Sequence, residues 1–222
     1  MRTGQAVPPT VSGGIGIGTK RPLVLQTYPL GADRRKPFGA DVKRYICSIP
    51  NAGLEGPIRE LFYSDDAAGY AQAEEFARRE DQPGRSVYDA VNLFHDDATS
   101  RRIVTVAALT CIHADIDLKD TEIDREEALR RIKSLEYPPD LVVDSGHGFH
   151  LYYRFREPVP TDRKDAAQAR SLRTRLVEFL GADRAPDQDA ALMRRPGTTN
   201  SKEAQQPVLC SIIAGEAVRH AI

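Results

Sequence analysis

The sequence predicts a mixed α/β (α+β) fold, because short apolar or alternating stretches are interspersed with longer stretches of helical spacing. The longer stretches begin at residues that can cap a helix, and one of them ends at glycine. Residues 1–40 are rich in Gly, Pro, Thr and basic residues and have only one short apolar run, at Pro22–Tyr28. We therefore expect a flexible N-terminal arm over residues 1–40 and a folded domain over residues 41–222.

The first strands and helix follow the arm directly. Val42–Ile49 alternates between apolar and polar residues and should be the first strand. Asp65–Arg79 is amphipathic with helical spacing, and either Asp65 or Asp66 can cap its first turn. A turn at Gly84 then leads into a strand over Ser86–Phe94.

The central part of the chain contains a long apolar stretch. Ile103–Leu118 ends in acidic residues and should contain a buried strand. Asp124–Leu135 is expected to be a helix capped by Asp124, with Glu126 and Arg130 paired one turn apart.

The last third is predicted to hold a hairpin, a long helix and a final strand. Leu141–Asp144 and Phe149–Phe155 flank the turn Ser145–Gly148. Asp162–Leu180 has the length of a long helix that Gly181 ends, and Pro207–Ile213 is the final strand.

Composition narrows the class of protein. The chain has 222 residues, of which 41% are hydrophobic and 28% charged, and its formal net charge is -1. A nucleic-acid surface would therefore have to be local. The three cysteines are widely spaced and odd in number, so they provide neither a metal motif nor a full disulfide set. Apolar runs are too short to span a membrane, and we expect a cytoplasmic protein.

An acidic pair stands at the end of the long apolar stretch. Asp115 and Asp117 are two residues apart, so in a strand both side chains lie on one face while Ile116 and Leu118 face the core. Adjacent carboxylates repel each other unless a cation lies between them. Their hard oxygen atoms suit Mg²⁺ or Mn²⁺. Acidic pairs are also common on surfaces, so this motif alone does not identify a site.

Two further segments have the composition of a phosphate-binding site. Ser145-Gly146-His147-Gly148 can form a tight turn whose amides face an anion, and His150 follows at the start of a strand. His150 could donate to a phosphate or could be a core histidine. Asp183 follows the long helix, and a basic, turn-rich stretch from Arg194 to Lys202 comes after it.

Together, the three segments resemble the motifs of the archaeo-eukaryotic primase superfamily, and most closely the primase-polymerase and RepB-type primases of plasmids and phages. The order in that superfamily is an acidic pair on a strand, a glycine-containing turn leading to His, and a third acid. In its mobile-element branches an Arg-x-Pro-Gly-Thr-x-Asn-x-Lys stretch follows, as at Arg194–Lys202 here. The resemblance covers roughly residues 85–213. Arg195 departs from it, because an apolar residue usually stands there.

The resemblance implies a fold in which an α/β unit is joined to an RRM-like unit with the active site between them. It implies template-directed nucleotidyl transfer with two Mg²⁺ or Mn²⁺ ions. Asp115, Asp117 and Asp183 would be the catalytic metal ligands, although Asp187 and Asp189 lie close enough in sequence to leave the third ligand open. The nucleotide-binding residues it implies are Ser145, Gly146, Gly148, His150, Arg194, Lys202 and Lys119.

The partners implied are single-stranded DNA template and primer, nucleoside triphosphates and, as a further candidate, a replicative helicase. Residues 41–222 would then be the primase-polymerase catalytic domain. Two other functions remain open: a non-catalytic single-strand-binding module of a replication initiator, and a metal-dependent phosphodiesterase. An assay with template, nucleotides and Mn²⁺ distinguishes the three functions, because they predict extension, binding alone or cleavage.

Removal of residues 1–20 should leave folding and the extension of a preformed primer largely unchanged. Because the arm is rich in Gly and Pro, it can bury too little apolar area to offset an ordering entropy of roughly 1–2 kcal/mol per residue. Its basic residues should instead add to template binding, measured as an affinity loss that is largest at low salt. A truncated protein less stable by several kcal/mol would show that the arm belongs to the core.

Overall fold

The structure is a computed structural model that describes residues 42–119, 123–202 and 206–215. The predicted arm, residues 1–40, lies outside the described residues, so the expectation for it stays a prediction. Among the described residues, no helix combines the length and the apolar character needed to cross a membrane.

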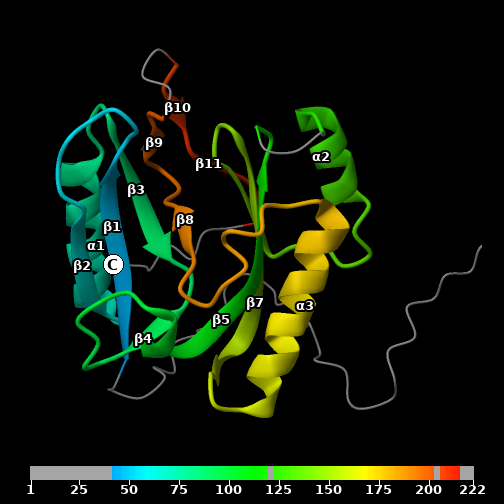
Figure 1. Cartoon of the computed structure of the whole chain (residues 1–222), viewed down its shortest axis with the longest axis horizontal. Coiled ribbons are helices and arrows are strands. Elements are labelled where there is room, and N and C mark those ends of the chain that lie inside the picture. Colours follow the sequence, from blue (N-terminus) through cyan, green and yellow to red (C-terminus); the bar gives the residue numbers. More distant parts are fainter. Residues whose placement is uncertain (1–41, 120–122, 203–205, 216–222) are drawn as a thin grey trace, which may run out of the picture.

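The described chain is built on one antiparallel sheet of nine strands (Figure 1). Its order is β11-β6-β7-β5-β4-β1-β3-β8, and β2 pairs with the other edge of β1. The strands are β1 (Val42–Pro50), β2 (Arg59–Ser64), β3 (Arg85–Ala90), β4 (Leu93–His95), β5 (Val106–Asp117), β6 (Leu141–Asp144), β7 (Gly148–Pro160), β8 (Leu192–Arg194) and β11 (Ser211–Gly215). A second, two-stranded ladder joins β9 (Thr199–Asn200) to β10 (Val208–Leu209).

The sheet divides at Val91 and Asn92. The strand predicted over Ser86–Phe94 is wrong in this respect, because β3 and β4 are separate: β3 pairs with β8, whereas β4 pairs with β5. The fully buried Asn92 fills the gap between the two branches. Its side-chain Nδ2 donates to the carbonyl of Asp189 at 2.8 Å, and its Oδ1 accepts from the N–H of Thr110, also at 2.8 Å.

Helices cover the two halves separately. In Figure 1, α1 (Ala67–Glu80) lies with β1, β2 and β3 on one side of the molecule. On the other side, α2 (Arg125–Lys133) and α3 (Lys164–Leu180) accompany β5, β6 and β7. The second half runs β5-α2-β6-β7-α3 with strand order β6-β7-β5, which is the arrangement of an RRM-like unit. The predicted mixed fold of two joined units is therefore confirmed.

Most predicted helix ends are also confirmed. Asp66 caps α1 by accepting from the N–H of Gly69, and Asp124 caps α2 by accepting from that of Glu127. Gly181 ends α3 in a left-handed conformation with φ of 64°. The predicted pairing of Glu126 with Arg130 is wrong, because Glu127 binds both Arg130 and Arg131.

Several short strands escaped prediction. The final strand expected over Pro207–Ile213 is interrupted at Cys210, so that β10 and β11 join different partners. The pattern also missed β2, β8 and β9. β2 starts with exposed residues, and β8 and β9 have only three and two residues, which is too short for a periodic signal.

Candidate active site

The acidic pair lies at the end of β5. In the register with β7, Asp115 faces His150 and Asp117 faces Gly148. Ile116 is fully buried on the opposite face, in the cluster that packs against α2 and α3, and Leu118 packs partly against that cluster. The shared face predicted for the two carboxylates is therefore confirmed. The Nε2 atom of His150 lies 3.6 Å from Oδ1 of Asp115.

The turn beside this pair is formed by its own hydrogen bonds. The N–H of Ser145 donates to the carbonyl of Gly148, and the N–H of Gly146 donates to Oδ1 of Asp144, both at 2.9 Å. These two amides are therefore used inside the turn, and a ligand would have to be bound by its other groups. Gly148 has no room for a side chain, because an added Cβ would lie 1.8 Å from the carbonyl oxygen of Ile116.

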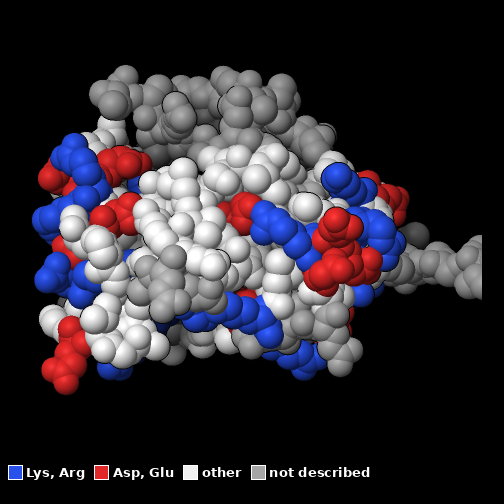
Figure 2. All heavy atoms as spheres, turned by 90° about the horizontal axis from the view of Figure 1, so that it is seen from above, with Lys and Arg blue, Asp and Glu red and all other residues white. Residues whose placement is uncertain are grey.

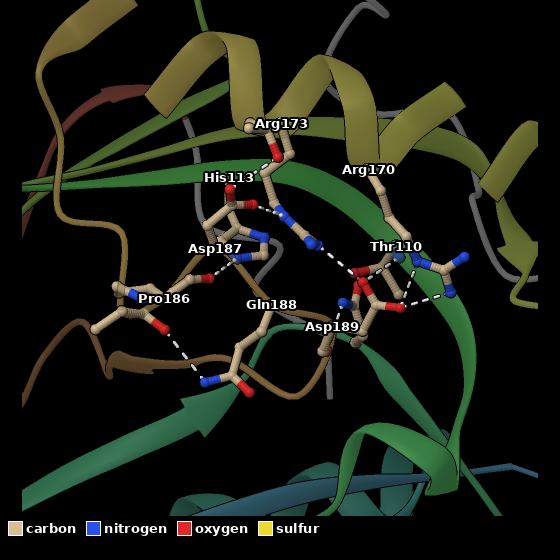
Figure 3. Close-up of polar contacts among 11 residues, drawn as sticks. Thr110, His113, Arg170, Arg173, Pro186, Asp187, Gln188 and Asp189 are labelled. Carbon is tan, nitrogen blue, oxygen red and sulfur yellow. Dashed lines mark hydrogen bonds and ion pairs between the residues drawn. The ribbon is translucent and has the colours of Figure 1, made fainter. Parts of the chain in front are cut away.

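Asp183 is held next to Asp115 by the backbone. Its N–H donates to the carbonyl of Asp115 at 2.7 Å, and its Oδ1 accepts from the N–H of Ala185 at 2.9 Å. The other two acids of the segment point elsewhere: Asp187 and Asp189 are ion-paired with Arg173 on α3 (Figure 3). The structure thus separates the three acids that the sequence left as alternatives.

The electrostatic coupling of the site appears in the pKa of Asp115. Burial, together with the nearby charges of Asp117 and Asp183, raises that pKa to about 7. Arg194 and Lys202 oppose the shift. Two basic residues and two further carboxylates therefore act electrostatically on Asp115. Among the residues that the structure describes, no group of three or more His, Cys, Asp or Glu side chains lies close enough together to hold a metal ion.

The basic segment closes the site from the other half of the molecule. Arg194 on β8 lies opposite Tyr88 on β3, with its guanidinium carbon 5.0 Å from the ring centre. Asn200 Nδ2 donates to the carbonyl of Ser145 at 2.6 Å, and Asn200 Oδ1 accepts from the N–H of Lys202 at 3.2 Å. Asn200 therefore joins the basic segment to the glycine turn.

Two other predicted or unusual basic residues have different surroundings. Lys119 has an exposed side chain, and its N–H donates to Oδ1 of Asp117 at 2.9 Å. Arg195, the departure from the family pattern, binds Asp89 at 2.8 Å and Glu74 at 2.5 Å. Both acids that bind Arg195 belong to the half of the molecule that contains α1.

His150 is buried and neutral. Burial, together with the charges of Arg194 and His113, lowers its pKa to about 3. Its Nδ1 atom is buried and has no hydrogen-bond partner among the described residues. The imidazole therefore has one nitrogen near Asp115 and a second nitrogen whose hydrogen-bonding capacity is unused.

Sequence reasoning missed two residues of the site. Asn200 stands in the quoted motif, but its residue type alone does not assign it a contact. Tyr88 lies in a strand before the motifs, and only the β3–β8 pairing brings it to Arg194. Seen from the end where β9 and β10 lie, Lys and Arg are interspersed with Asp and Glu, and the described surface on this face has no broad basic area (Figure 2).

Comparisons with known proteins agree on the fold. The structure is similar to the AEP domain of the primase-polymerase of cyanophage S-2L, with a TM-score of 0.55 and 16% identity over 80% of this chain and 82% of that one. It is also similar to the primase RepB′, with a TM-score of 0.52 and 18% identity over 78% of this chain. It spans 52% of the RepB′ chain. No family model and no curated protein matches the sequence. The chain therefore has the fold of an archaeo-eukaryotic primase domain.

Asp115→Asn should stabilise the metal-free protein at pH 8. The folded-state pKa of Asp115 is about 7, whereas the usual pKa of a carboxyl group is about 4. The protein therefore loses stability as the pH rises from about 4 to about 7, because the carboxyl group ionises more readily in the unfolded state. The variant should exceed wild type by on the order of 2 kcal/mol at pH 8 and by much less at pH 4.5. Urea unfolding with a chelator at both pH values measures this. A variant less stable than wild type at pH 8 would contradict it.

Proposed function

We propose that this chain is a DNA primase or primase-polymerase domain that transfers nucleotides on a template with two Mg²⁺ or Mn²⁺ ions. The observation that carries the proposal is the hydrogen bond between the Asp183 N–H and the Asp115 carbonyl, which sets a third acid beside the pair on β5. Arg194 and Lys202 act electrostatically on the same carboxylate. Acids on one side and cations on the other suit a metal-bound triphosphate.

The donor set fits these metals. Carboxylate oxygens are their preferred protein ligands, and Asp115, Asp117 and Asp183 would hold them. Asp117 and Asp183 each accept a backbone N–H through Oδ1, which orients both carboxylates. A cation would relieve the repulsion that raises the pKa of Asp115. Ions held there would lower the pKa of a 3′-hydroxyl and would offset charge on a leaving pyrophosphate.

The remaining residues would position the nucleotide. Arg194 is held over Tyr88, so its guanidinium is oriented before a phosphate arrives. His150 is neutral, and its unpartnered Nδ1 can donate a hydrogen bond. The turn Ser145–Gly148 would shape the wall of the nucleotide site. Lys202 and the exposed Lys119 would offset phosphate charge of nucleotide or template.

The fold neighbours support the choice of reaction. Both are named as primases, and one is a phage primase-polymerase. Single-stranded DNA template, primer and nucleoside triphosphates follow as partners, in the cytoplasmic replication of a phage, plasmid or other mobile element. A replicative helicase is a further partner under this proposal. Incubation with primed template, nucleotides and Mn²⁺ tests the function: extension supports it, whereas binding alone or strand cleavage supports one of the two alternatives.

Asp115→Ala, Asp117→Ala and Asp183→Ala should each reduce nucleotide incorporation by at least about 100-fold, because each removes charge stabilisation at the reacting phosphates. Circular dichroism should show a native fold in all three. Glu178→Ala is the matched control, since Glu178 is an exposed acid on α3 that pairs with Arg184 at 3.2 Å. Wild-type incorporation by any of the three site variants would refute its assignment as a ligand.

His150→Ala should weaken nucleotide binding while metal affinity is nearly retained. The imidazole is neutral and offers a hydrogen bond, so its loss removes a contact to the triphosphate and no ionic ligand. A rise in the KM for nucleotide at saturating Mn²⁺ measures the first effect, and calorimetry with Mn²⁺ alone measures the second. A large loss of Mn²⁺ binding without nucleotide would contradict this division of roles.

A further inference from the structure

The loop between α3 and β8 carries Asp183 and two more acids that have a different environment. Oδ1 of Asp187 accepts from Nε of Arg173 at 2.7 Å, and Oδ1 of Asp189 accepts from Nη1 of Arg173 at 3.0 Å. The side chains of Arg173 and Asp189 are only 6% and 4% exposed. One guanidinium therefore bridges two carboxylates in a nearly dry environment (Figure 3).

The second oxygen of each carboxylate is also bonded to α3. Oδ2 of Asp187 accepts from the hydroxyl of Thr174 at 2.8 Å, and Oδ2 of Asp189 accepts from Nε of Arg170 at 2.7 Å. Arg173 and Thr174 lie three and four residues after Arg170, so all three share one face of α3. All four carboxylate oxygens of Asp187 and Asp189 are thereby satisfied, and neither acid needs a metal.

The same loop is attached to β5 by two contacts that precede the fixed acids in sequence. The Nε2 atom of His113 lies 2.9 Å from the carbonyl oxygen of Pro186, and His113 is two residues before Asp115 on the same strand face. The N–H of Asp183 binds the Asp115 carbonyl. Contacts to β5 and ion pairs to α3 therefore together set the position of Asp183.

We infer that Arg173 is a positioning residue, which through Asp187 and Asp189 holds the loop so that Asp183 lies beside Asp115 before a metal binds. The inference rests on the proposed function. Bringing a third carboxylate to an acidic pair costs free energy, because like charges repel. When buried ion pairs hold the loop in place, folding has already supplied that free energy. The loop then reorganises less when the metal binds.

Arg173→Lys tests the inference. A lysine keeps the positive charge, but its single ammonium cannot reproduce the planar fork that bridges two carboxylates. Arg175→Lys is the matched control, because it makes the same substitution at an exposed position of the same helix. Calorimetry with Mn²⁺ alone, without DNA or nucleotide, gives the dissociation constant for each protein.

Arg173→Lys should raise the Mn²⁺ dissociation constant by about 10-fold or more, in the range found when residues that orient metal ligands are changed. The Mn²⁺ concentration for half-maximal extension should rise by the same factor, while kcat at saturating Mn²⁺ stays near wild type. Arg175→Lys should change neither value. An unchanged dissociation constant in a folded Arg173→Lys protein would overturn the inference and leave Arg173 a purely structural residue.

Two further measurements keep the test decisive. If Arg173→Lys does not fold, Thr174→Val removes a single bond to Asp187 and should still weaken Mn²⁺ binding, so wild-type affinity in that variant would overturn the inference. Failure of the proposed function has a different signature. In that case wild type binds no Mn²⁺, or Asp115→Asn binds it as tightly as wild type does.

Discussion

The buried amide of Asn92 determines how the two halves of the molecule meet. It satisfies Thr110 on β5 and Asp189 before β8, at the point where one strand ends and the next begins. β8 pairs with β3, whereas β5 pairs with β4. β8 therefore carries Arg194 from the half of the molecule that contains α1 toward the acids on β5.

Charge is distributed unequally among acids that are close in sequence. Asp187 and Asp189 have arginine partners, and in this loop Asp183 alone is among the acids that raise the pKa of Asp115. Buried carboxylates with arginine partners stay ionised without a metal, whereas mutually close carboxylates favour a bound cation. The loop therefore contributes both a structural anchor and a candidate ligand, and only the three-dimensional arrangement distinguishes them.

The sequence predicted the parts of the fold and site that depend on local rules. Asp115 and Asp117 share a face because strand side chains alternate, and Asp124 and Gly181 end helices through bonds within a few residues. The division at Asn92 was not predictable, since its hydrogen-bond partners lie 18 and 97 residues away. Asp187 and Asp189 stayed open as alternatives to Asp183 for the same reason: their exclusion depends on ion pairs to α3 that the sequence does not reveal.

The contacts of Asn200 have a consequence for biosynthesis. Asn200 binds the Ser145 carbonyl, and the hydroxyl of its neighbour Ser201 donates to the carbonyl of Arg85. The segment that links the glycine turn to the start of β3 is thus among the last of the described residues to leave the ribosome. A nascent chain that has completed β7 already carries the acidic pair and its histidine, yet it lacks that link. The contacts between the glycine turn, the basic segment and the start of β3 can therefore form only after Asn200 and Ser201 have been made.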